Sequence, residues 1–111
     1  MVEEPESGAA VALTSRGVRL AKQGHFDDAA NCLRLALASD PGYLLAHKNL
    51  VIVLESLGDL GGAIQACELL LQNSPNAAGI RNKLGSLCAK QGNFDGALNH
   101  FRNALALGYD R

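Results

Sequence analysis

A repeat of 34 residues is the feature that most constrains how this chain can fold. The segment AKQGHFDDA at residues 21–29 returns as AKQGNFDGA at residues 89–97, 68 residues later, and a related segment at residues 56–63 falls in phase halfway between them. A fixed period of this length is typical of proteins built from stacked supersecondary units. The chain therefore divides into three repeats, residues 10–43, 44–77 and 78–111, behind an acidic N-terminal tail of residues 1–9 that we expect to be flexible.

Each repeat is predicted to contain two helices joined by a tight turn. Gly24, Gly58 and Gly92 are in phase, and glycine suits the left-handed residue that closes many helices because it has no Cβ atom to clash. Pro41 and Pro75 are also 34 residues apart. They mark the end of the second helix of their repeats, because the residue before a proline is forced out of the helical region.

Local chemistry supports the helical prediction. Asp59 and Asn93 offer side-chain oxygens that can cap the second helix of a hairpin, whereas His25 is a weaker cap at the matching position. Apolar residues recur with three-and-four spacing, which is typical of amphipathic helices. The apolar residues are mostly Leu and Ala and only 5% of the chain is aromatic, which favours helices over strands. We therefore predict an all-α fold of six helices.

The period and its marker residues resemble the tetratricopeptide repeat family. The third repeat matches the family pattern at Leu84, Gly85, Gly92, Phe94, Ala97, Phe101 and Ala104, and the first repeat matches it at Gly17, Gly24, Phe26, Ala29, Ala36 and Pro41. The resemblance covers residues 10–111. It implies that helix-turn-helix repeats stack into a right-handed α-solenoid, whose concave groove is lined mainly by the first helix of each repeat.

The same resemblance implies which side chains line this groove. They are Val11, Thr14, Val18 and Lys22 in the first repeat, Leu45, Lys48, Asn49, Ile52 and Glu55 in the second, and Asn82, Lys83, Ser86 and Lys90 in the third. Apolar residues flanked by lysines predict a protein or peptide partner with apolar anchors and some acidic residues. The chain is thus expected to be an interaction scaffold or adaptor.

One specialised role of the family is not expected. Some members hold acidic C-terminal tails of chaperones in a clamp of Lys, Asn and Arg side chains. Here Thr14 and Val18 replace two clamp residues, Gly79 replaces a third, and only Asn49 and Lys83 fit. Capture of a terminal carboxylate needs several converging donors, so this clamp is largely missing.

Composition predicts neither catalysis nor binding to nucleic acid or membrane. The formal net charge is -1, the N-terminus is acidic, and no apolar run is long enough to span a bilayer. Cys32, Cys67 and Cys88 lack the spacing of metal ligands, and Cys67 and Cys88 are expected to pack in the core. We therefore predict no enzyme activity, no cofactor and no metal, and a cytoplasmic location.

Two other functions stay open. The third repeat is not followed by the polar-faced helix that often covers the last repeat of this family, so Leu98, Phe101 and Leu105 are expected to be partly exposed. This C-terminal end could pair with another copy. Alternatively, the repeats could recruit substrate for a larger enzyme, such as a transferase. His47 and Arg81 also depart from the family, which usually has a large apolar residue at these positions.

Overall fold

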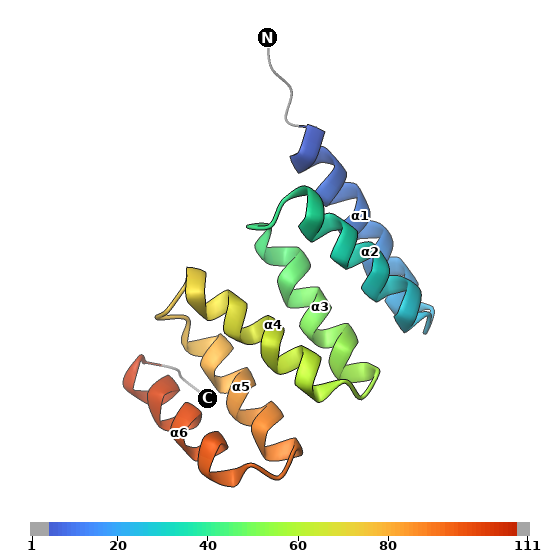
Figure 1. The fold of residues 1–111 in the computed structure, drawn as a ribbon. Helices are drawn as coiled ribbons and strands as arrows, with labels where there is room; N and C mark the ends of the chain where they lie inside the picture. Colours follow the sequence, from blue (N-terminus) through green and yellow to red (C-terminus); the bar gives the residue numbers. More distant parts are fainter. Residues whose placement is uncertain (1–4, 109–111) are drawn as a thin grey trace. The chain divides into compact units, whose positions relative to one another are not determined.

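The structure, a computed structural model, describes residues 5–108 and contains six α-helices and no strand in that range (Figure 1). The helices are α1 (Pro5–Lys22), α2 (Phe26–Ser39), α3 (Leu44–Ser56), α4 (Leu60–Asn73), α5 (Ala78–Lys90) and α6 (Phe94–Ala106). The prediction of an all-α chain with two helices per repeat is confirmed.

The helices fall into two compact units, and each is described by itself. Unit 1 is Met1–Asp59, in which α1 and α2 form an antiparallel hairpin and α3 packs against both of them. Unit 2 is Leu60–Arg111, in which α5 and α6 form the equivalent hairpin and α4 packs against α5.

The phased glycines close the first helix of each repeat, as predicted. Their φ angles are +85° at Gly24, +81° at Gly58 and +86° at Gly92, in the left-handed region that a side chain would make costly. The backbone amide of the next residue then bonds back into the helix, as in the 2.9 Å bond from the His25 amide to the Leu20 carbonyl.

The first helix begins before residue 10, the predicted start of the first repeat. Helix α1 begins at Pro5, so residues 5–9 of the expected flexible tail are helical, and Ala10 is already fully buried. Proline is well accepted at the first position of a helix, because its fixed φ matches and its missing amide hydrogen would have no intrahelical partner. Residues 1–4 of the predicted tail lie outside the described residues.

The two hairpins close through glycines in their first helices. A Cβ atom at Gly17 would lie 3.0 Å from Cγ of Leu33, and one at Gly85 would lie 2.6 Å from Cε1 of Phe101. The axes of α1 and α2, and of α5 and α6, therefore approach to a distance that leaves no room for a methyl group. The absence of a side chain at these two glycines thus lets the helix axes come together.

His47 fills a core position in an unexpected way. It is only 8% exposed, and its Nε2 atom lies 2.8 Å from the carbonyl oxygen of Pro41 in the turn before α3. A buried polar side chain needs such a partner to offset its loss of water. The bond explains how a histidine occupies a site that the family usually gives to an apolar residue.

Candidate functional site

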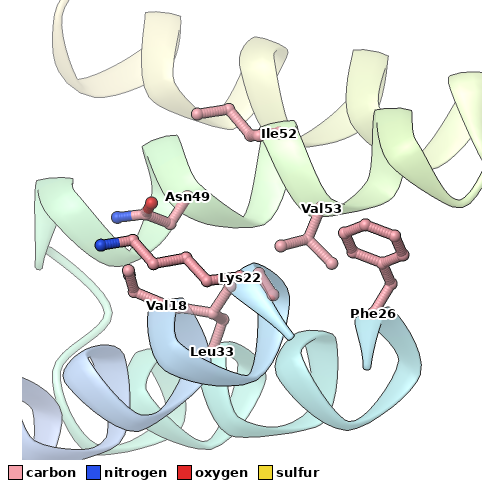
Figure 2. Close-up of a pocket in the computed structure, with 8 residues that line it drawn as sticks. Val18, Lys22, Phe26, Leu33, Asn49, Ile52 and Val53 are labelled. Atoms are coloured by element: carbon pink, nitrogen blue, oxygen red, sulfur yellow. The ribbon is translucent and has the colours of Figure 1, made fainter. Parts of the chain in front are cut away.

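Unit 1 contains an apolar hollow with a volume of about 260 Å³ (Figure 2). Three helices contribute to its wall: Val18, Ala21 and Lys22 come from α1, Phe26 and Leu33 from α2, and Asn49, Ile52 and Val53 from α3. Six of these eight residues are apolar. The hollow exists because α3 packs on both helices of the first hairpin, which brings three helix faces together.

Buried side chains form the base of this hollow, and more exposed ones form its rim. Leu33 is fully buried and Val53 is 2% exposed, whereas Ile52 is 56% exposed. Phe26 is half-buried, and Figure 2 shows its ring facing Val53. An apolar side chain that entered the hollow would therefore leave water for contact with aliphatic and aromatic carbon, which is favourable.

Two polar residues border the apolar surface. Figure 2 shows the ends of the Lys22 and Asn49 side chains on the same side of the hollow. The Nδ2 atom of Asn49 donates a 2.9 Å hydrogen bond to the carbonyl oxygen of Leu45, one helical turn earlier. This bond fixes the orientation of the amide. Lys22 is exposed, so it presents a positive charge at the edge of the hollow.

The structure brings together four residues of the predicted groove: Val18, Lys22, Asn49 and Ile52. Four others of unit 1 lie outside the hollow. Val11 and Leu45 are 49% and 51% exposed, Lys48 is exposed, and Glu55 is half-buried.

Thr14 is a wrong prediction for a groove residue. Its side chain is 2% exposed, and its hydroxyl oxygen is buried without a hydrogen-bond partner. Helix α1 packs against α3 as well as α2, so less of its surface is open than a single hairpin would leave.

The remaining predicted residues lie on α5 of unit 2. Asn82, Lys83 and Ser86 are half-buried, and Lys90 is exposed in the last turn of the helix. These residues belong to a different unit from the hollow. A groove that continues over all three repeats stays a prediction.

Sequence reasoning missed half of the residues that line the hollow. Ala21, Phe26, Leu33 and Val53 have the apolar spacing of packing residues, which does not distinguish them from the rest of the core. One signal was available for Phe26, because it begins α2 directly after the turn at Gly24 and so lies at the connected end of the hairpin. The others depend on how α3 meets the hairpin, which periodicity does not reveal.

Two other features, a metal centre and a membrane-spanning helix, are absent from the described part of the chain. Among those residues, no group of three or more His, Cys, Asp or Glu side chains could hold a metal ion. None of the described helices is long and apolar enough to cross a bilayer. Cys32, Cys67 and Cys88 are buried and form no disulfide, and the burial of Cys67 and Cys88 agrees with the prediction that they pack in the core.

Family models identify the repeats. One tetratricopeptide repeat model matches residues 14–78, and a second matches residues 82–111. The chain belongs to the tetratricopeptide repeat family. No curated protein matches its sequence.

Several solved structures share this fold. A crystal structure of MamA is 25% identical, covers 89% of this chain and superposes with a TM-score of 0.84. The N-terminal domain of stress-induced protein-1 (STI-1) from C. elegans is 22% identical over 95% of this chain and 88% of its own, with a TM-score of 0.86. The chain spans just over half of two MamA structures, 58% of one and 54% of the other.

A third structure was solved with a peptide. The first tetratricopeptide repeat domain of Spaghetti (RPAP3), bound to the HSP90 peptide SRMEEVD, is 20% identical to this chain. The match covers 95% of this chain and 83% of that domain, with a TM-score of 0.84.

Proposed function

We propose that this chain is a protein-interaction module that binds a partner peptide, with the hollow of unit 1 as the anchor site. The observation that carries the proposal is the combination of a 260 Å³ apolar hollow with a rim residue, Ile52, that is 56% exposed. Apolar concavities of this kind, bordered by a few polar groups, are the usual form of a binding site. An exposed isoleucine at the rim gains contacts when a partner covers it.

The partner we propose carries an apolar side chain beside an acidic residue. The apolar side chain would occupy the hollow between Phe26, Leu33 and Val53, and the acidic group would lie near Lys22 at its edge. The peptide bound by the Spaghetti domain, SRMEEVD, also has apolar residues next to acidic ones. Charge at the rim chiefly selects the partner and speeds association, while the apolar contact supplies most of the affinity.

Recognition of a terminal carboxylate is a weaker candidate for this chain. The clamp described for other family members needs cationic and amide donors, but Thr14 is buried and Val18 is apolar. Gly79, at a third clamp position, has no side chain. We therefore propose an anchor within the peptide rather than its C-terminus as the main determinant.

This role requires binding and no chemical step. The residues of the hollow offer one amine and one amide and no pair of groups that could act as nucleophile and base. We propose an adaptor or scaffold acting in the cytoplasm, and three cysteines without a disulfide agree with a reducing compartment. Recruitment of substrate to a larger enzyme would use the same hollow.

The test selects peptides from a random 12-residue library on the wild-type chain and then measures their affinity by fluorescence anisotropy. We expect the selected peptides to share a large apolar residue within a few positions of Asp or Glu. Ile52→Glu should weaken their binding about 10- to 100-fold, because it removes roughly 1.5–3 kcal/mol of apolar contact. Leu35→Glu is the matched control, since Leu35 is 57% exposed on α2 and does not line the hollow.

Equal affinity of the Ile52→Glu chain and the wild type would contradict the proposal. So would a loss of binding in the Leu35→Glu chain alone. Circular dichroism on both variants verifies that neither has lost helix, so that a loss of binding reports the site.

A further inference from the structure

Helix α6 exposes a continuous apolar stripe that the proposed peptide site does not use. Phe94 is 71% exposed, Leu98 48% and Leu105 53%, and Phe101 between them is half-buried. These residues are spaced by four, three and four positions, which places them on one side of a helix with 3.6 residues per turn. Contiguous apolar surface of this kind marks an interaction site.

The equivalent face of α2 shows what this stripe is suited to bind. The residues 68 positions earlier than Leu98 and Phe101 are Ala30 and Leu33, and they are 2% and 0% exposed. Within unit 1, α2 packs against α3 as well as its hairpin partner α1. Within unit 2, α6 packs against α5 alone. The stripe on α6 is therefore a helix-packing face that has no second helix against it in unit 2.

The charges beside the stripe select its occupant. Phe94, Leu98, Phe101 and Leu105 occupy the d, a, d and a positions of a heptad pattern, which puts Asp95 and Arg102 at the two e positions. Both charged side chains are exposed on the same flank of α6. On the other flank, Ala97 and Ala104 are 4% and 1% exposed, so that side is already closed.

We propose that α6 pairs with α6 of a second copy in an antiparallel, two-fold symmetric dimer. In an antiparallel pair the e positions of the two helices face each other, so Asp95 of each chain meets Arg102 of the other. Because the dimer is two-fold symmetric, it contains this oppositely charged pair twice. A parallel pair would instead set the e positions opposite the buried Ala97 and Ala104, where no charge is available.

Head-to-tail stacking through α1 of a second copy fits less well. The buried α3 residues Leu50 and Val53 are 7% and 2% exposed, and their counterparts 34 positions earlier on α1 are Arg16 and Arg19. Both arginines are exposed. Packing them onto the leucines and phenylalanines of α6 would remove two guanidinium groups from water without a partner, which is costly.

The test is the mass of the chain in solution, measured by sedimentation equilibrium up to about 1 mM, because interfaces below about 1,200 Å² are usually weak. The wild type should approach twice its monomer mass of 11.6 kDa. Asp95→Arg and Arg102→Asp should each raise the dimer dissociation constant about tenfold or more, because each creates two like-charged pairs. An equimolar mixture of these two variants should dimerise again, and so should the chain that carries both exchanges.

Three results would overturn the proposal. The wild type could remain a monomer at 1 mM, Leu98→Glu could dimerise as well as the wild type, or the mixture of charge variants could fail to recover the dimer. The last result, obtained with intact helices by circular dichroism, would mean that another arrangement or a helix from another protein covers α6. Loss of peptide binding in the Ile52→Glu chain is independent of all three results.

Discussion

The aromatic ring of Phe101 lies directly against the backbone of Gly85. A Cβ atom added to the glycine would be 2.6 Å from Cε1 and 2.7 Å from Cδ1 of this ring, closer than carbon atoms approach in proteins. The contact joins the middle of α5 to the middle of α6. It sets how closely the two helices of the C-terminal hairpin can pack.

Gly85→Ala should therefore destabilise the chain. Overpacking typically costs about 1–3 kcal/mol, and the better helix propensity of alanine returns roughly 1 kcal/mol, so we expect a net loss of up to about 2 kcal/mol. Gly79→Ala is the control within the same helix, because nothing lies within 4 Å of a Cβ atom there. Urea unfolding followed by circular dichroism measures both, and a Gly85→Ala chain as stable as Gly79→Ala would contradict the packing described.

Substitutions at the N-caps of α2 and α6 should change the free energy of unfolding in opposite directions. The Oδ1 atom of Asn93 accepts a 3.0 Å hydrogen bond from the Gly96 amide, whereas His25 at the matching position makes no such bond. Asn93→Ala should lower the free energy of unfolding by about 1 kcal/mol, and His25→Asn should raise it by about 0.5–1 kcal/mol. A shift of the same sign in both variants, measured by thermal unfolding, would be evidence against this difference between the two caps.

The turn between α5 and α6 requires a residue that accepts a positive φ angle. Gly92 has φ +86°, and a Cβ atom added there would have no other atom within 4 Å, so the cost of substitution is conformational rather than steric. Gly92→Ala should lose about 1–2 kcal/mol of stability, and Gly92→Asn should lose less because asparagine tolerates the left-handed region. Denaturant midpoints for the two variants would test this, and equal losses would point to a different cause.

The phased glycines and prolines were sufficient to predict where most of the helices end. Gly24 and Gly92 mark turns because their conformation is local, and Pro41 marks a helix end for the same reason. Where α1 begins was harder to predict. Acidic residues near the N-terminus favour a solvated tail, although Pro5 is also a favourable first residue for a helix.

The site was only partly predictable. Val18 and Ile52 lie on the open faces of α1 and α3, where the resemblance to the tetratricopeptide repeat family had placed them. Thr14 was misplaced because its exposure depends on where α3 crosses α1. Leu33 was missed for the opposite reason. Its sequence pattern is that of a buried packing residue, and such a residue can also form the base of a hollow.

Labelling of the buried cysteines can report where the folded chain opens locally. Each repeat contains one thiol, Cys32, Cys67 or Cys88, and these residues are 9%, 0% and 6% exposed. A bulky thiol reagent reaches a sulfur at that depth only when the surrounding helices separate. The order in which the three thiols are labelled therefore gives the order in which the repeats open, repeat by repeat, without any engineered probe.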